Sequence, residues 1–243
     1  MQISQTLQEK LRSAQNVVAL TGAGISAESG VPTFRGENGI WKKMRPEELA
    51  NFDAFMRNPK LVWEWYEYRR QLIHNVQPNA GHYALVEMER RYASFTLVTQ
   101  NVDNLHQRAG NKHVVEMHGN IMRNKCMLCE RYYTAVLDLN QEKGVPVCEC
   151  GGYIRPDVVW FGELIPEQSL IDTNESLESC DLMFSIGTSG IVYPAASFPG
   201  IGKRNGAYVV EVNIERTILS SEMDEVLLGP SGKILPELLE LMS

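Results

Sequence analysis

Residues 17–30 of the chain read VVALTGAGISAESG, a compact apolar run followed directly by a glycine-rich turn. An uninterrupted apolar run of this length, bounded by glycine, is typical of a buried strand. Gly22, Gly24 and Ala27 then satisfy the pattern G-x-G-x-x-G/A, whose glycines permit a tight turn and a close approach of backbone N–H groups to a pyrophosphate. Ordinary strand-to-helix turns also meet this pattern. Dinucleotide binding is therefore a first hypothesis that needs support from the rest of the chain.

Further apolar runs of strand length recur along the chain, separated by stretches that could be helical. They lie at 95–98, 114–115, 182–186 and 208–212, with amphipathic helices expected at 5–14 and 234–242. Alternation of this kind favours a parallel sheet covered by helices on both faces. We therefore predict an α/β fold built on a Rossmann-like doubly wound parallel sheet.

Two stretches interrupt the alternation and are expected to form one small lobe. The first stretch, 34–75, has no pattern typical of a strand. Asn58 and Pro59 are a good N-cap and first-turn pair for a helix that runs to Arg70. In the second, four clustered cysteines replace hydrophobic periodicity, as in a module held together by metal. The predicted domains are a Rossmann-like dinucleotide-binding domain, residues 1–33, 76–122 and 156–243, and a small domain made of a helical insertion, 34–75, and a metal-binding module, 123–155.

The clustered cysteines indicate one structural zinc ion. Cys126-x-x-Cys129 and Cys148-x-Cys150 supply four thiolates, which select zinc and form a closed tetrahedral site with no open position for chemistry. The single residue between Cys148 and Cys150 is shorter than the usual spacing of such modules. Reduced thiols without metal are the alternative, and Cys180 is expected in the core.

Composition narrows the range of partners and locations. The chain has 243 residues and a formal charge of −7, which argues against a general nucleic-acid binder because phosphate neutralisation needs clustered lysine and arginine. It contains no apolar run long enough to span a bilayer and no basic-then-apolar leader. We therefore expect a cytoplasmic protein that acts on a small ligand or another protein, without nucleic-acid or membrane binding.

Polar side chains follow the strand at 95–99, where open parallel sheets place their ligand crevices. Gln100, Asn101 and Asp103 stand at this position, although an Asn and an Asp here could also cap the next helix. A dehydrogenase has a second strand that ends in Asp or Glu about twenty residues after its glycine-rich turn. Such a strand is absent here, and 32–36 begins a polar loop instead. This favours NAD binding without hydride transfer.

Two longer stretches of sequence make the hypothesis of NAD binding more specific. GAGISAESGVPTFRG at 22–36 and TQNVDNLHQRAG at 99–110 resemble the two signatures of the sirtuin family. The resemblance continues in the family's order through Met117-His118-Gly119, the cysteine module, 158–163, 187–189 and 213–215, and so covers almost the whole chain.

The resemblance implies an NAD-dependent protein lysine deacylase that yields deacylated lysine, nicotinamide and O-acyl-ADP-ribose. It makes His118 the general base, whereas a histidine chosen blindly is more often structural. Val102 and Asp103 would hold the nicotinamide, and Asn101 would orient polar groups near the reacting carbon. The implied catalytic residues are His118, Asn101 and Asp103; the implied NAD-binding residues are Gly22, Ala23, Gly24, Ser26, Ala27, Glu28, Thr33, Phe34, Arg35, Trp41, Gln100, Asn101, Val102, Asp103, Gly187, Thr188, Ser189, Asn213, Ile214, Glu215 and Ser231. Acylated-lysine proteins are the implied partners, and no obligate partner is implied.

Tyr66 and Arg69 bear on the acyl group because residues three apart share one helix face. A guanidinium fork and a phenol suit a carboxylate, and this Tyr-x-x-Arg pair resembles that of the sirtuin subgroup that removes succinyl and malonyl groups. The alternative is that the arginines of this helix pair with Glu64 and Glu67 on a solvated face. We favour desuccinylation and retain deacetylation. The implied substrate-binding residues are Tyr66, Arg69, Phe161, Gly162, Glu163 and Val192, with the peptide adding as a strand.

Two rival functions remain at this point. Mono-ADP-ribosyl transfer shares the departure of nicotinamide from NAD. A non-catalytic NAD sensor or zinc-ribbon interaction module would bind without turnover, and the combination of Asn101, Asp103 and His118 argues against it.

Overall fold

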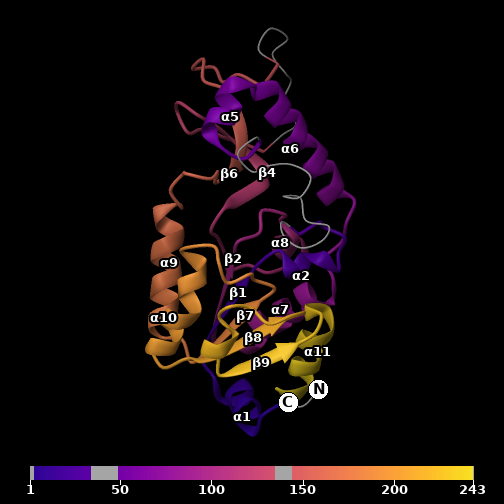
Figure 1. Cartoon of the computed structure of the whole chain (residues 1–243), viewed down its shortest axis with the longest axis vertical. Helices are drawn as coiled ribbons and strands as arrows, with labels where there is room; N and C mark the ends of the chain where they lie inside the picture. The colour runs from indigo at the N-terminus through magenta and orange to yellow at the C-terminus, as the bar shows by residue number, and fades with distance from the viewer. Residues whose placement is uncertain (1–2, 34–48, 135–143, 243) are drawn as a thin grey trace.

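A parallel six-stranded sheet in the order β3-β2-β1-β7-β8-β9 forms the larger lobe of the computed structural model, which describes residues 3–33, 49–134 and 144–242 (Figure 1). Its strands are β1 (Asn16–Thr21), β2 (Ser94–Thr99), β3 (Val114–Glu116), β7 (Leu182–Ile186), β8 (Tyr208–Asn213) and β9 (Glu225–Leu228). Every neighbouring pair runs parallel. The predicted doubly wound parallel sheet is confirmed, with β9 as an additional edge strand that the sequence analysis missed.

Helices cover both faces of this sheet, which explains why its strands are apolar at consecutive positions. Val17 and Ala19 point into a core shared with α1 (Gln5–Ser13), α7 (Ala80–Arg91) and α11 (Ser231–Leu241). Val18 and Leu20 point to the opposite face, towards α9 (Glu167–Glu178) and α10 (Phe198–Arg204). Strands buried on both faces need apolar residues throughout, and this is the pattern that the sequence carries.

The strand register brings several turns to one edge of the sheet. Thr21 is aligned with Thr99 of β2 and with Ile186 of β7, which is in turn aligned with Val212 of β8. The residues that follow these strands therefore lie side by side. Because β1 is flanked by β2 on one side and β7 on the other, this edge contains the point where the strand order reverses, the usual ligand position in such folds.

Among the described residues, the smaller lobe combines an antiparallel sheet with the helices α5 (Phe52–Arg57) and α6 (Pro59–His74) (Figure 1). Its strands are β4 (Gly119–Cys126), β5 (Tyr132–Tyr133) and β6 (Ile154–Val158) in the order β5-β4-β6. Phe55, Tyr66 and Trp160 are buried in its core.

The sequence analysis expected α6 to end at Arg70, but the helix continues to His74 because Ile73 is also buried. The short helices α2 (Gly24–Ala27) and α8 (Leu105–Ala109) belong to the larger lobe. The residue bounds of the two predicted domains stay a prediction.

The four clustered cysteines meet at the end of β4 with a geometry that fits one tetrahedral metal ion. Their sulfur atoms all lie within 4.8 Å of one another, with Cys126 3.5 Å from Cys150 and Cys129 3.6 Å from Cys148. Thiolates bound to zinc at about 2.3 Å lie about 3.8 Å apart in a tetrahedron. The residues therefore fit a structural zinc ion.

A tight turn explains how the short Cys148-x-Cys150 spacing still closes the site. The N–H of Cys148 donates to the carbonyl of Gly152 at 2.8 Å, and the N–H of Gly151 donates back to Cys148 at 2.8 Å. Gly151 has φ of +85°, and a Cβ on Gly152 would lie 2.8 Å from the Cys126 sulfur. Both glycines thus let the second cysteine pair fold back onto the first.

None of the helices in the described ranges combines the length and the apolarity needed to cross a bilayer.

We expect Cys126→Ser to lower bound zinc from about one ion per chain to almost none, because three thiolates cannot close the structural site. Elemental analysis of the purified protein measures the zinc, and a thermal scan should show a lower unfolding midpoint. The matched control is Cys180→Ala, which removes a buried thiol of the larger lobe and should leave the zinc content intact. Full zinc content in Cys126→Ser would show that the cluster is not the metal site.

Candidate active site

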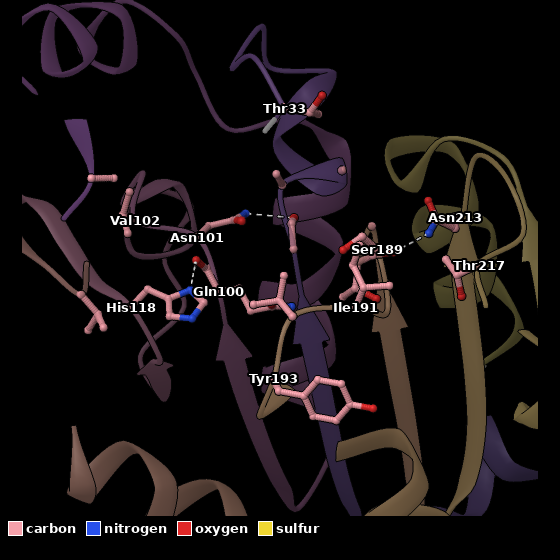
Figure 2. A pocket seen from close by; sticks show the side chains of 18 of the residues that line it. Thr33, Gln100, Asn101, Val102, His118, Ser189, Ile191, Tyr193, Asn213 and Thr217 are labelled. Carbon is pink, nitrogen blue, oxygen red and sulfur yellow. Dashed lines mark hydrogen bonds between the residues drawn. The ribbon is translucent and has the colours of Figure 1, made fainter. Parts of the chain in front are cut away.

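A cavity of about 890 Å³ lies between the two lobes, at the carboxyl edge of the parallel sheet. One part of it is lined by residues at the ends of four strands of the large sheet: Gly22, Gln100 and Gly187 each follow a strand, and Asn213 is the last residue of β8. Another part is lined by α6. In Figure 2, Gln100, Asn101 and His118 stand on one side of the cavity, and Ser189, Asn213 and Thr217 stand on the other.

Most of the predicted site residues line this one cavity. The lining includes Gly22, Ala23, Gly24, Thr33, Tyr66, Arg69, Gln100, Asn101, Val102, His118, Phe161, Gly162, Glu163, Gly187, Thr188, Ser189, Val192, Asn213, Ile214, Glu215 and Ser231. Ser26, Ala27, Glu28 and Asp103 lie outside the lining. Phe34, Arg35 and Trp41 lie outside the described residues.

The glycine-rich turn packs backbone to backbone against the turn after β7. The N–H of Gly22 donates to Ile186 and that of Gly24 to Gly187, both at 2.9 Å. A Cβ on Gly24 would lie 2.6 Å from the Cα of Gly187, so no side chain fits between the turns. We predicted that these glycines would let N–H groups reach a pyrophosphate. In the structure, the N–H groups of Gly22 and Gly24 instead donate hydrogen bonds to the end of β7 and the turn after it. The missing side chains of these two glycines let that turn approach closely.

Asp103 supports the cavity wall from behind. Its carboxylate accepts a hydrogen bond from the Ser26 hydroxyl at 2.7 Å and from the N–H of Leu105, the first residue of α8, at 3.0 Å. The second contact gives Asp103 a structural role at the start of α8, although the N-cap residue of this helix is Asn104 and its side chain makes no capping hydrogen bond. Asn101 is part of the same group, because its amide donates to the Gly22 carbonyl at 3.0 Å and to the Ser26 hydroxyl at 3.3 Å. These contacts tie the glycine-rich turn to the end of β2.

Glu28 joins the glycine-rich turn to the last helix. Its carboxylate accepts hydrogen bonds from the Ser231 hydroxyl at 3.2 Å and from the N–H of Gly232 at 2.8 Å. On the far side of the cavity, the Asn213 amide donates to the Thr188 carbonyl at 2.8 Å (Figure 2). The turns after β1, β7 and β8 are therefore linked around the cavity.

His118 lies between β3 and β4 with its ring in the cavity wall. Its Nδ1 is 2.9 Å from the carbonyl of Gln100 (Figure 2). A carbonyl can only accept, so Nδ1 carries the proton of the neutral ring and Nε2 keeps its lone pair. Burial lowers the pKa of His118 below the ordinary value, and the hydrogen bond to Gln100 opposes this in part. The ring is thus held as a neutral base.

Tyr66 and Arg69 present one face of α6 to the cavity, and both are buried. The Arg69 guanidinium lies over the ring of Trp65, 4.9 Å from its centroid. Glu67 pairs with Arg70, which also donates to the Ile121 carbonyl at 2.6 Å. The pairing on the helix face that we considered as the alternative is therefore made by Arg70.

The sequence analysis missed several lining residues, of which the aromatic ones matter most. Trp65 and Trp160 line the cavity beside Tyr66 and Phe161, the residues that follow them in the chain. Their adjacency to predicted site residues was the available signal. The other missed lining residues include Ala50, Arg216, Thr217 and Ile218.

Comparison with known proteins gives one consistent family. The model of the Sir2 family matches residues 22–194. An NAD-dependent protein deacylase of Aquifex aeolicus is 54% identical over 213 residues, covering 86% of this chain and 87% of that protein. NAD-dependent protein deacylase 2 of Pyrobaculum aerophilum is 48% identical over 231 residues, covering 95% and 92%.

Solved structures agree over almost the whole chain. A Sir2 homologue in complex with NAD has a TM-score of 0.91 at 41% identity, with 99% of this chain and 94% of that chain covered. A mutant Sir2 homologue in complex with ADP-ribose has a TM-score of 0.93 at 41% identity, with 99% and 96% covered. On the family match and on these relatives, the chain belongs to the Sir2 family.

Proposed function

We propose that this protein is an NAD-dependent protein lysine deacylase, which moves the acyl group of a modified lysine onto the ADP-ribose part of NAD and releases nicotinamide. The observation that carries the proposal is His118, a neutral base fixed by Gln100 in the wall of the cavity that Asn101 and the glycine-rich turn also line. The related proteins named NAD-dependent protein deacylase support it. So does a mutant Sir2 homologue in complex with 2′-O-acetyl-ADP-ribose, at 41% identity and a TM-score of 0.91.

The cavity suits a dinucleotide in size and in the distribution of its polar groups. Its volume of about 890 Å³ lies within the usual range for cofactor sites. Thr188, Ser189 and Asn213 offer hydroxyl and amide groups at the ends of β7 and β8. When bound, NAD would supply the ribose that accepts the acyl group and a leaving nicotinamide.

The residues of the chain would perform two tasks in this reaction. The Nε2 of His118 would take a proton from a hydroxyl placed beside it, which a neutral imidazole with a free lone pair can do. Asn101 would orient the reacting groups, because its amide is anchored to the Gly22 carbonyl, and the Gln100 carbonyl would hold the His118 ring in place. The two lobes together would exclude water from the reacting atoms.

The acylated protein would bind between the loop at 161–163 and the segment at 191–193. Phe161, Gly162, Ile191 and Tyr193 are exposed at the mouth of the cavity, where an extended peptide could add as a strand. A Sir2 protein in complex with a p53 peptide and NAD⁺, with a TM-score of 0.85 at 31% identity, supports a peptide substrate.

We further propose that the enzyme prefers acidic acyl groups such as succinyl or malonyl. Arg69 offers a buried cation, and burial raises the pKa of Tyr66, so its phenol stays a hydrogen-bond donor. A carboxylate can accept hydrogen bonds from both groups, whereas an acetyl methyl can accept none.

We expect His118→Gln to lower kcat/KM for an acyl-lysine peptide by about 100-fold or more, because a general base is removed. Nicotinamide release measured by chromatography reports turnover, and zinc content and the unfolding midpoint should stay unchanged. The matched control is His113→Gln at an exposed position. Activity close to wild type in His118→Gln would remove the general-base assignment.

The pH profile of the wild-type enzyme tests the same assignment independently. Burial lowers the pKa of His118 below 6.5, and only the neutral ring can take a proton. We therefore expect kcat/KM to be maintained through neutral pH and lost as pH falls through the lowered pKa. An acidic limb with its midpoint above 6.5 would contradict this account.

We expect Arg69→Met to lower kcat/KM for a succinyl-lysine peptide by about 10- to 100-fold, the value of a charge-assisted hydrogen bond. The loss for an acetyl-lysine peptide should be much smaller. Mass spectrometry of both peptides, with and without NAD, measures the two rates. Arg57→Met, at an exposed position of α5, is the control. Unchanged rates for both peptides in Arg69→Met would contradict the acyl preference, and nicotinamide release that needs no acyl-lysine would favour ADP-ribosyl transfer.

A further inference from the structure

A hydrogen bond links the two lining residues Trp160 and Tyr66, which belong to different elements. The indole N–H of Trp160, just after β6, donates to the hydroxyl oxygen of Tyr66 on α6 at 2.9 Å. Both side chains are buried, with 2% and 1% of their surface exposed, and both line the cavity. The bond therefore joins the segment after β6, which leads into the loop at 161–163, to α6, the helix that carries Arg69.

This hydrogen bond decides what the Tyr66 hydroxyl can still do. Indole N–H is only a donor, so the hydroxyl acts as the acceptor and keeps its own proton. No described residue accepts that proton from Tyr66 in the structure. The proton is left for a ligand in the cavity that can accept it.

Trp160 is itself held firmly enough to direct this hydroxyl. Its backbone N–H donates to the Glu163 carboxylate at 2.8 Å, and the Arg155 guanidinium lies over its ring, 3.2 Å from the centroid. Phe55 packs on the indole with ring centroids 5.2 Å apart. A cation over the face of an indole withdraws electron density from the ring, which strengthens its N–H as a donor.

We propose that Trp160 is a specificity-determining residue that holds the Tyr66 hydroxyl as a donor towards the far end of the acyl chain. This rests on the proposed acidic-acyl deacylase, and it assigns part of that preference to a residue outside the Tyr66 and Arg69 pair. An acyl chain that ends in a carboxylate gains from the directed proton. An acetyl group has no acceptor at that end and gains nothing.

The test is a double-mutant cycle read as the ratio of kcat/KM for succinyl-lysine and acetyl-lysine peptides. Trp160→Phe keeps an aromatic ring but removes the N–H, and we expect the ratio to fall by about 5- to 10-fold, as for one hydrogen bond. The change should appear mainly in KM for the succinyl peptide. In a Tyr66→Phe background the added Trp160→Phe should leave the ratio unchanged, because the hydroxyl on which it acts is gone.

Trp63→Phe is the matched control, a buried tryptophan of the same lobe that does not line the cavity. It should leave the ratio at the wild-type value, and zinc content and the unfolding midpoint check that each variant is folded. A ratio that is unchanged in Trp160→Phe, or that falls equally with and without Tyr66, overturns the role of Trp160. Arg69→Met measured in the same assay separates the two proposals. If it lowers the succinyl rate while Trp160→Phe leaves the ratio unchanged, only the role of Trp160 fails; if it leaves the succinyl rate unchanged, the acidic-acyl preference itself fails.

Discussion

The close contact between two glycine turns is the constraint on which the site depends. Gly24 meets Gly187 where a Cβ would lie only 2.6 Å from the Cα of Gly187, so any side chain at either position would separate the ends of β1 and β7. These ends lie where the strand order reverses, and the cavity opens directly above them. The polar groups after β2 and β8 can share one cavity only because the central turns stay this close.

Both lobes hold the backbone around His118 in place. The residue before His118 is tied to the large sheet, since Met117 donates to Thr99 at 2.9 Å. The carbonyl of His118 accepts from Val159 in the small lobe, also at 2.9 Å. Gly119 packs against the backbone of Asp157 so closely that a Cβ would be 2.2 Å from its carbonyl oxygen. The imidazole of His118 therefore lies at the junction of the two sheets, and its position depends on how the two lobes are arranged.

Local patterns predicted the parts of this structure that depend on local physics. Uninterrupted apolar runs indicated the buried strands, and the spacing of Tyr66 and Arg69 placed both on one helix face. Short or partly polar strands such as β4 and β9 carry no such signal, because their pairing comes from neighbours distant in the chain. The same holds for the contact of Trp160 with Tyr66, which are 94 residues apart. Sequence spacing also could not distinguish Asn101, which lines the cavity, from Asp103, which lies behind it.

The position of β1 has a consequence for how the chain reaches this structure. β1 is made early, yet one of its two partners is β7, where Val17 is aligned with Leu182. During synthesis one side of the central strand therefore lacks its hydrogen-bonding partner until most of the polypeptide has left the ribosome. Pairings of such high contact order form slowly and leave apolar edges exposed in the meantime. The strand order that builds the cavity thus delays completion of the sheet, because its central strand is paired on both sides only after β7 has been made.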